Sequence, residues 1–210
     1  MQKKIKIIMI MLVVILFTLT SCKSKSKIGG ISMNKEIYAQ IVLTTGEKIN
    51  LQLFHEYAPE TVENFVKLAS EDYYKGTIFH RIIDNFMIQT GGYKIEDNSL
   101  LELAETDTIK GEFASNGFEL NTIKHELGVI SMARTNIKDS ATSQFFICSA
   151  TVPHLDGEYA AFGKTTDEES NKVVLKLSKV ETYAMHYMFQ NFPCDIIEIE
   201  NIYISNKIFK

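Results

Sequence analysis

The sequence predicts an all-β fold with helical caps, and three observations support this prediction. Short segments with an apolar residue at every second position recur along most of the chain, as expected of strands with one buried face. Two segments far apart in the sequence instead carry apolar residues three and four positions apart, which is typical of amphipathic helices. The length of 210 residues, 45% of them hydrophobic, suits one domain with a sizeable core. The hydrophobic pattern alone does not distinguish a β-barrel from a β-sandwich.

The first predicted elements are a β-hairpin and a helix. Apolar residues alternate over 36–43 and again over 49–53, and Thr45-Gly46 between them suits a turn. Pro59 suits the first turn of a helix that ends near 70–74. The apolar stripe of that helix is Val62, Phe65, Val66 and Ala69.

Short strands and loops follow this helix. Strands over 78–83 and 86–90 flank a turn at Asp84-Asn85, where asparagine tolerates a left-handed backbone. Residues 93–124 are polar, acidic and poorly periodic, so we expect a loop with at most one short helix. The remaining predicted elements are strands over 128–133, 144–148, 160–163 and 196–204 and a helix over 168–179.

The first 22 residues indicate an export signal rather than part of the fold. Three lysines among the first six residues precede an uninterrupted apolar run of 11 residues at 7–17. This run is shorter than the roughly 20 residues that span a bilayer, but it suits a signal peptide. The motif Leu19-Thr20-Ser21-Cys22 that follows is similar to the bacterial lipobox, in which the signal peptidase cuts before a cysteine that carries lipid. The alternative is an ordinary signal peptide with a chance cysteine.

The lipobox predicts how the chain is divided. We expect a lipoprotein signal peptide over 1–21, then lipidated Cys22 and a flexible tether over 22–35, then a domain over 36–210. Cleavage before Cys22 removes three lysines and no acid, which changes the formal net charge from −4 to −7. The predicted location is extracytoplasmic, with lipid on Cys22 anchoring the domain to the bacterial cell membrane.

Charge and cysteine content exclude several classes of function. The 22 basic and 26 acidic residues lack the basic excess typical of nucleic-acid binding, so we expect no nucleic-acid partner. Three cysteines without a Cys-x-x-Cys motif support neither a zinc ribbon nor a disulfide scaffold. We expect free, buried thiols at Cys148 and Cys194; a disulfide between them is the alternative. Only Arg81 and Arg134 are arginines, which reflects either genome bias or positions where lysine would not serve.

Four motifs in a fixed order resemble the signature of cyclophilin-type peptidyl-prolyl isomerases, in the form that bacterial members have. The first helix, with Pro59-Glu60-Thr61-Val62-Glu63-Asn64-Phe65, matches the helix that precedes them in that family. The motifs are Phe79-His80-Arg81-Ile82-Ile83 with Phe86-Met87-Ile88-Gln89-Thr90-Gly91-Gly92, Ser131-Met132-Ala133-Arg134, Ser143-Gln144-Phe145-Phe146-Ile147, and Leu155-Asp156-Gly157 with Phe162-Gly163-Lys164. The resemblance implies a closed eight-stranded antiparallel barrel capped by two α-helices, with a packed interior and a substrate groove on its outer surface.

The same resemblance assigns the candidate site. It implies that Arg81 and Gln89 are catalytic, with Arg81 as hydrogen-bond donor and Gln89 positioning it. It implies a proline pocket made of Phe86, Met87, Phe146 and Leu155. The other implied substrate-binding residues are His80, Ala133, Arg134, Gln144, His154 and Tyr159. His154 stands where many members have tryptophan, Tyr159 where many have histidine, and Arg134 in place of an asparagine, which puts cyclosporin binding in doubt.

The chemistry of X–Pro isomerisation is compatible with these residue types. Amide resonance gives an uncatalysed barrier of about 18–20 kcal/mol. In the twisted transition state the prolyl nitrogen regains a lone pair, so a donor aimed at it stabilises the transition state more than the planar ground state. A guanidinium is a permanently charged donor, and one charge-assisted hydrogen bond contributes about 1.5–3 kcal/mol. We therefore expect neither metal nor cofactor.

The sequence thus predicts a monomeric peptidyl-prolyl cis-trans isomerase. Its expected partners are proline-containing peptides and unfolded exported proteins. Two alternatives stay open: a surface-tethered peptide-binding chaperone or adhesin with little relevant catalysis, and a carrier barrel with a ligand-sized cavity. Two segments, 93–124 and the stretch 181–195 that is longer than the family norm, have no assigned role.

Overall fold

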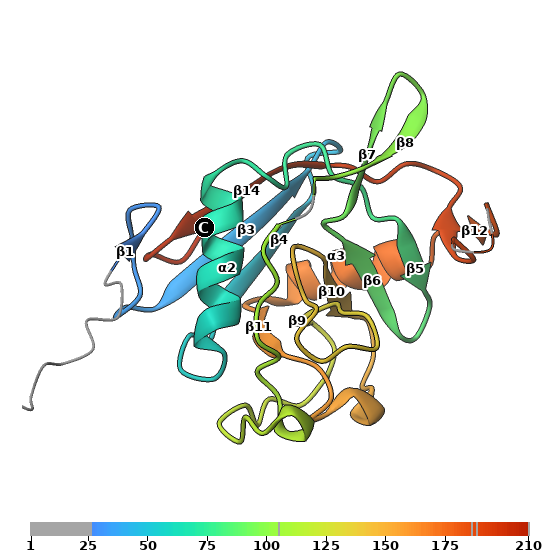
Figure 1. Ribbon diagram of the computed structural model, residues 1–210. Helices are drawn as coiled ribbons and strands as arrows, with labels where there is room; N and C mark the ends of the chain where they lie inside the picture. The colour runs from blue at the N-terminus through green and yellow to red at the C-terminus, as the bar shows by residue number, and fades with distance from the viewer. Residues whose placement is uncertain (1–26, 105, 186, 188, 210) are drawn as a thin grey trace, which may run out of the picture.

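The computed structural model describes residues 27–104, 106–185, 187 and 189–209, and its centre is a curled antiparallel sheet covered by two helices (Figure 1). Eight strands form this sheet within the described part of the chain. Their order across the sheet is β14 (Ile199–Ser205), β3 (Ile37–Leu43), β4 (Lys48–Leu53), β11 (Ala161–Thr165), β9 (Val129–Met132), β10 (Phe145–Cys148), β6 (Met87–Thr90) and β5 (Arg81–Ile83). The all-β prediction, with eight antiparallel strands and two helices, is confirmed.

The sheet does not close into a complete barrel. Its end strands, β14 and β5, are not paired with each other; the residues before β5 reach the chain before β14 instead. There Phe79 N donates to Ile197 O at 2.9 Å, and one isolated bridge joins Ile78 to Glu198. The pairing is irregular, because Ile199 accepts from Gly76 N but donates to Thr77 O, both at 2.8 Å, instead of exchanging both bonds with one residue. The closed barrel that we expected is therefore corrected to a curled sheet with an irregular seam.

Two helices pack on the sheet as predicted. The first, α2 (Pro59–Ser70), packs against β14 and buries the apolar stripe expected of it, including Phe65. The second, α3 (Glu168–Ser178), packs against β4. Its N-cap residue is Asp167, whose side chain accepts from Ser170 N at 2.7 Å. That bond satisfies one of the backbone N–H groups left open at a helix start.

Aromatic rings fill the interior of the curled sheet. Phe65 from α2 lies 5.3 Å from both Phe145 and Phe162, centroid to centroid, and Tyr74 lies 5.4 Å from Phe145. All four side chains are fully buried. The carrier alternative required a ligand-sized cavity inside the barrel, and this packing excludes it.

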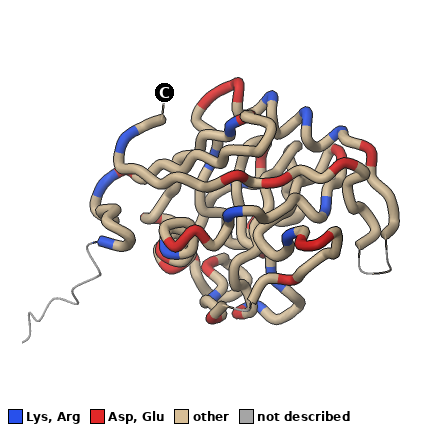
Figure 2. Tube along the Cα trace, turned by 90° about the horizontal axis from the view of Figure 1, so that it is seen from above, with Lys and Arg blue, Asp and Glu red and all other residues tan. Residues whose placement is uncertain are grey.

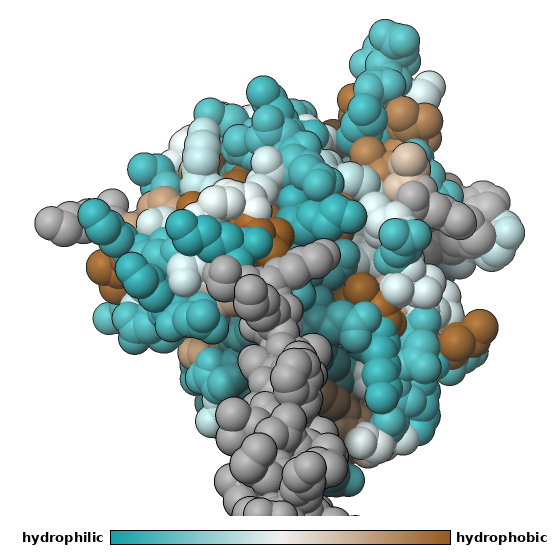
Figure 3. Space-filling model, turned by 60° about the vertical axis from the view of Figure 1, so that its left-hand side comes forward, coloured by the Kyte–Doolittle hydropathy of each residue, from teal (hydrophilic) through white to brown (hydrophobic). Residues whose placement is uncertain are grey.

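The predicted loop over 93–124 contains a β-hairpin that we did not expect. Strands β7 (Tyr93–Glu96) and β8 (Ser99–Glu102) pair around Asp97-Asn98, both of which have positive φ, as a tight two-residue hairpin turn requires. The hairpin projects from the body of the molecule, with hydrophobic surface at its base (Figures 1 and 3). The short helix expected in this stretch is a 3-10 turn, η1 (Ala114–Asn116).

The described part of the predicted tether is folded. Strands β1 (Lys27–Ile28) and β2 (Ile31–Ser32) pair as a small hairpin that contacts α2, and Met33 is buried in the core. The apolar side chains at 28, 31 and 33 explain this, because they are buried only if the segment packs on the domain. The folded domain thus includes 27–35. The predicted signal peptide and Cys22 lie outside the described residues.

Three further elements lie outside the main sheet. The segment 181–195 forms a short pair of strands, β12 (Thr182–Tyr183) and β13 (Phe192–Pro193), and η2 (Pro153–Leu155) is a second 3-10 turn. No helix of the described residues is both long and apolar enough to cross a membrane. Basic and acidic residues are interspersed along the trace (Figure 2).

The two cysteines of the domain are free thiols, as predicted. Cys148 is buried, and burial raises the pKa of its thiol to about 12. Cys194 is exposed, which corrects the expectation that both thiols are buried. It follows β13 at the surface because the segment it belongs to lies outside the main sheet.

Candidate active site

Nine of the twelve predicted catalytic and substrate-binding residues line one cavity. It has a volume of about 110 Å³ and lies on the outer face of the sheet, over β5, β6, β9 and β10. Its lining consists of Arg81, Phe86, Met87, Gln89, Ala133, Arg134, Phe146, Leu155 and Tyr159. The period of two along each strand explains how one face of the sheet holds the core and the other the cavity. Phe145 points inward and its neighbour Phe146 outward.

The floor of the cavity is an apolar cluster separate from the main core. Met87, Phe146 and Leu155 are almost fully buried there, together with Val152 and Cys148. Phe86 and Tyr159 are partly buried against them. A small apolar ring, such as that of proline, would lose its contact with water in this floor without meeting a charged group.

Arg81 stands at the edge of this floor with its guanidinium held by side chains. β5 and β6 pair Arg81 with Gln89, and Arg81 Nη1 donates to Gln89 Oε1 at 3.3 Å, with Met87 Sδ 3.8 Å away. Gln89 Nε2 donates in turn to Gln144 Oε1 at 2.9 Å. Partial burial lowers the pKa of Arg81. A guanidinium nonetheless stays protonated in proteins, so the group is a fixed cationic donor.

Gln144 completes this chain of amides and lines the neighbouring cavity. That second cavity, of about 150 Å³, adjoins the first through Gln89, Ala133 and Arg134, which line both. A Cβ atom at Gly92 would lie 2.5 Å from Gln144 Nε2, so glycine at this position leaves room for the amide. The two cavities therefore form one continuous groove along these shared residues.

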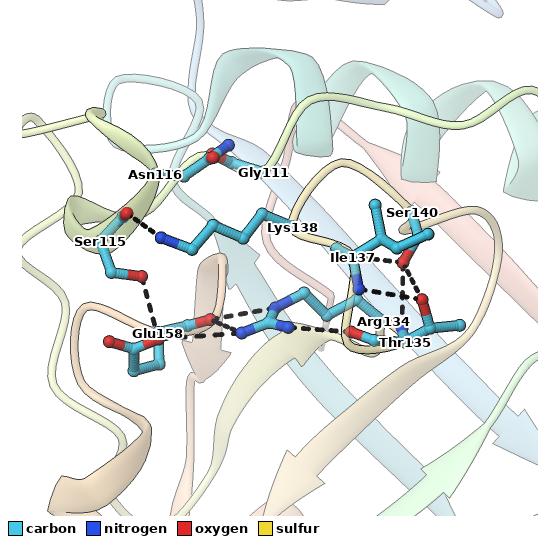
Figure 4. A network of polar contacts seen from close by, with 9 residues as sticks. All are labelled: Gly111, Ser115, Asn116, Arg134, Thr135, Ile137, Lys138, Ser140 and Glu158. Atoms are coloured by element: carbon cyan, nitrogen blue, oxygen red, sulfur yellow. Dashed lines mark hydrogen bonds and ion pairs between the residues drawn. The ribbon is translucent and has the colours of Figure 1, made fainter.

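Arg134 lines the groove with a guanidinium that is anchored to neighbouring protein groups (Figure 4). Its Nη2 and Nε donate to the Glu158 carbonyl at 2.9 and 3.2 Å, and its Nη1 donates to the Thr135 carbonyl at 2.8 Å. The guanidinium carbon lies 4.5 Å from the centre of the Tyr159 ring and 5.1 Å from that of Phe113. Arg134 therefore acts as a strut that supports Tyr159 at the place where the two cavities adjoin.

His80 and His154 lie beside the main cavity and do not line it. The His80 ring is buried against Tyr93, 4.7 Å between centroids, and its burial lowers the pKa of His80 to about 4. His154 is exposed at the rim and stacks on Phe86 at 5.6 Å. His80 is therefore a neutral wall behind the groove, and His154 extends its apolar rim.

Sequence reasoning assigned His125 no role in the site, yet it supports the floor from behind. Its ring stacks on Phe146 with centroids 6.1 Å apart. Its Nδ1 lies 3.2 Å from Asp156 Oδ1, and its Nε2 lies 3.1 Å from Ser131 Oγ. These contacts join separate segments of the chain, so no local sequence pattern could have shown them. The pairing of Ser131 with Phe146 across β9 and β10 brings the two partners of the His125 ring side by side.

Comparisons with known proteins agree with this geometry. The family model described as cyclophilin type peptidyl-prolyl cis-trans isomerase/CLD matches residues 38–203. A peptidyl-prolyl cis-trans isomerase of Acinetobacter baylyi is 36% identical over 183 residues, which cover 82% of this chain and 92% of that protein. Peptidyl-prolyl cis-trans isomerase A of Dickeya dadantii is 39% identical over 172 residues, covering 80% of this chain and 84% of the relative.

Solved structures of cyclophilin-type isomerases are similar to this chain in fold. A crystal structure of a Cryptosporidium parvum cyclophilin type peptidyl-prolyl cis-trans isomerase has a TM-score of 0.63 and 27% identity, covering 81% of this chain and 98% of that one. A second structure of that protein, in the presence of the dipeptide Ala-Pro, has a TM-score of 0.62 with 27% identity, covering 80% and 98%.

Proposed function

This chain belongs to the family of cyclophilin-type peptidyl-prolyl cis-trans isomerases, and we propose that it accelerates X–Pro isomerisation in proteins exported from a bacterial cytoplasm. The observation that carries the proposal is the placement of Arg81 and its amide partners at the edge of an apolar pocket. A proline-containing peptide, the ligand class of the related Cryptosporidium structure, is the occupant that this combination suits.

The reaction makes and breaks no covalent bond between heavy atoms. It consists of a rotation about the prolyl amide bond. The prolyl ring sits on Met87, Phe146 and Leu155 and is held there while the preceding carbonyl turns. As the amide twists, its nitrogen becomes pyramidal and gains a lone pair, and Arg81 donates a hydrogen bond to it. Gln89 accepts from Arg81 and so keeps the guanidinium aimed at the groove.

The energies involved are moderate. A charge-assisted hydrogen bond contributes about 1.5–3 kcal/mol, which corresponds to one or two decades in rate. The remaining acceleration comes from the fixed position of the ring and its flanking peptide groups. Because X–Pro isomerisation takes tens of seconds or longer without catalysis, an enzyme of this kind matters where unfolded chains accumulate.

The export signal supports an extracytoplasmic site of action. A signal peptide over 1–21 and lipid on Cys22 place the isomerase at the outer face of the membrane, where newly exported chains fold. Metabolic labelling with radioactive palmitate tests the anchor: the full-length protein should incorporate label, and the Cys22→Ser variant should not. Equal labelling of both would contradict the lipid site.

The isomerase assay with Ala-Pro peptides tests the catalytic proposal directly. In a protease-coupled or NMR exchange measurement, Arg81→Ala should lower kcat/KM by ten- to a hundredfold. Arg81→Lys, which keeps the charge but loses the planar donor fork, should recover little of it. A wild type no faster than solvent, or an Arg81→Ala variant as fast as wild type, would overturn the proposal.

The second candidate is a tethered chaperone or adhesin that binds peptides without relevant catalysis. The projecting hairpin β7–β8 and the segment 181–195 are the features that favour it, because both add surface beside the groove. It predicts that Arg81→Ala rescues client folding as well as wild type does. Loss of rescue in that variant would favour the enzyme.

A further inference from the structure

The segment 182–193, which we call the aromatic arm, lies along the free edge of the strand that carries Arg81. Its two short strands β12 and β13 pair with each other, and β13 contacts β5. A direct backbone bond fixes the arm to that edge, because Ile82 N donates to Asn191 O at 2.9 Å. The arm is thus attached next to the catalytic strand and not at a distant part of the domain.

A continuous series of rings connects the groove to the arm. The series starts at His80, directly before Arg81. Centroid distances are 4.7 Å from His80 to Tyr93, 5.2 Å from Tyr93 to Phe189, 6.1 Å from Phe189 to Phe192 and 6.0 Å from Phe192 to Tyr183. These separations are typical of interacting aromatic pairs. The series therefore forms one packed body that runs from the wall of the groove to the surface.

The outer part of the arm exposes large apolar side chains. Tyr183 is 45% exposed, Met185 38% and Tyr187 75%, whereas Phe192 beneath them is 3% exposed. Three such side chains within five residues, with the buried Phe192 ring in contact with Tyr183, form a local patch of the kind that marks interaction sites. Tyrosine and methionine also suit recognition of varied apolar partners, because tyrosine is amphipathic and methionine adapts its shape.

We propose that the aromatic arm is a docking surface for an apolar or aromatic side chain of the client, two to three residues away from the proline held in the groove. This inference rests on the proposed isomerase function. Neighbouring strands lie about 4.8 Å apart and an extended peptide advances about 3.3 Å per residue. A peptide that contacts Arg81 on β5 therefore reaches the arm within two or three residues. The arm would select clients by the residue two to three positions away from the proline of their X–Pro bond.

The surroundings of the arm favour a peptide over a membrane surface. Glu181 and Asp195 flank the two ends of the arm in sequence, and Cys194 N donates to the Glu181 carbonyl at 2.9 Å. Desolvation raises the pKa of the Cys194 thiol, and the carboxylates of Glu181 and Asp195 add to this rise. Anionic lipid headgroups would be repelled by this pair. An uncharged segment of an unfolded chain would not be, and its binding would continue a groove that already holds the proline.

Fluorescence titration with short peptides tests the docking surface. The chain contains no tryptophan, so a tryptophan in the peptide reports binding without background. Two probes are Ala-Trp-Ala-Pro-Ala-Ala and Ala-Ala-Pro-Ala-Trp-Ala, with competitors that carry alanine or glutamate in place of tryptophan. One tryptophan probe should bind about three- to tenfold more tightly than its alanine competitor, and the glutamate competitor should bind most weakly.

The matching variants separate the arm from a general effect. Tyr183→Ser combined with Tyr187→Ser should remove most of the tryptophan preference. Tyr203→Ser should retain it, because Tyr203 is exposed to the same extent, 46%, but lies on β14. An unchanged preference in the arm variant, or no preference in the wild type, would overturn the docking surface. So would arm-dependent binding to phosphatidylglycerol vesicles or arm-dependent dimers in place of peptide selection.

The isomerase assay distinguishes the two proposals. If wild type turns over Ala-Pro peptides without an arm-dependent preference, the docking surface fails and the enzyme stands. If the arm-dependent preference is present but no turnover is found, the proposed function fails and the docking surface stands.

Discussion

The two arginines of the chain make different contacts that both depend on planar donor geometry. Arg81 keeps its guanidinium at the groove, with Gln89 as its acceptor. Arg134 instead directs three nitrogens at two backbone carbonyls and stacks on Tyr159. A lysine ammonium offers neither the fork nor the flat face. This explains why arginine is retained at these two positions in a chain whose other 20 basic residues are lysines.

Replacing Arg134 tests its function as a strut. Arg134→Lys should lower kcat/KM on Ala-Pro peptides by several-fold, because the ammonium cannot bond to the carbonyls of Glu158 and Thr135 at once and Tyr159 loses its stacked support. Lys164→Ala, a change at an exposed surface ion pair, is the control and should be neutral. Full activity of Arg134→Lys would show that charge alone suffices at this position.

His80 should make stability depend on pH in mildly acidic solution. Its pKa is about 4 in the folded protein against 6.5 when unfolded, so between these values the unfolded chain binds more protons and unfolding becomes easier as pH falls. Urea unfolding at pH 7 and pH 4.5 should show a loss on the order of 3 kcal/mol from this residue. Burial also lowers the pKa of His125, which makes its own contribution to the pH dependence, so the comparison is with His80→Phe. An equal loss in that variant would contradict the assignment.

Residue identities in the site were largely predictable, but their orientations were not. Phe86, Met87, Gln89 and Phe146 line the cavity as expected, because they lie on or beside strands whose alternating side chains face it. The direction of Arg134 depends on Glu158, 24 residues along the chain, and no local pattern encodes that contact. The burial of His80 likewise depends on Tyr93 and Phe189, which belong to the two segments that had no assigned role.

At the scale of elements, α2 depends on a distant side chain for its N-terminal cap. Ala58, the residue before the helix, has no side-chain acceptor. Glu112 supplies one from a loop, accepting from Glu60 N at 3.0 Å and Thr61 N at 2.8 Å. Burial of Glu112 raises the pKa of its carboxyl, and the two backbone donors partly oppose this rise. The helix that carries Phe65 into the core is thereby fixed at its start.

Removing this cap should destabilise the whole domain. Glu112→Ala should lower the free energy of unfolding in urea by about 1–2 kcal/mol, the usual effect of losing an N-cap acceptor, and Glu112→Gln should lose less because it keeps one acceptor oxygen. Glu119→Ala, a change at an exposed carboxylate of the neighbouring loop, should be neutral. Equal stability of Glu112→Ala and wild type would show that water satisfies the helix start.

Two physical causes explain the elements that sequence reasoning missed. The hairpin β7–β8 has charged side chains at Lys94 and Glu96 and a turn formed by Asp97-Asn98, so its sequence reads as a polar loop. β1 and β2 have two residues each, too few for periodicity to show. By contrast, the longer elements β3, α2 and α3 follow their predicted ranges because each buries a full stripe or face in the core.

On the scale of the whole molecule, the curled sheet separates stability from function. Its inner face holds the aromatic core around Phe145, and its outer face holds the second apolar cluster around Phe146. Consecutive residues of one strand thus serve the two clusters. The groove can vary in sequence without opening the core, which agrees with a site that has arginine, histidine and tyrosine at positions where the family often has other residues.

The folded N-terminal hairpin limits how far the domain extends from its proposed lipid anchor. The described residues begin at Lys27, and five residues, 22–26, stand between it and the proposed lipid on Cys22. Fully extended, they span at most about 18 Å. The domain and its aromatic arm should therefore stay close to the membrane surface.

Energy transfer from a dye on the protein to a lipid dye in vesicles measures this proximity. Cys194 is the site for labelling, because it is exposed, whereas the buried Cys148 has a thiol pKa of about 12 and stays protonated. Inserting 20 Gly-Ser residues between Ser26 and Lys27 adds about 25 Å of reach and should lower the transfer markedly. Turnover of soluble Ala-Pro peptides should stay the same, because the insertion lies far from the groove. Equal transfer with and without the insertion would show that the domain is held at the membrane by a contact of its own and not by a short tether.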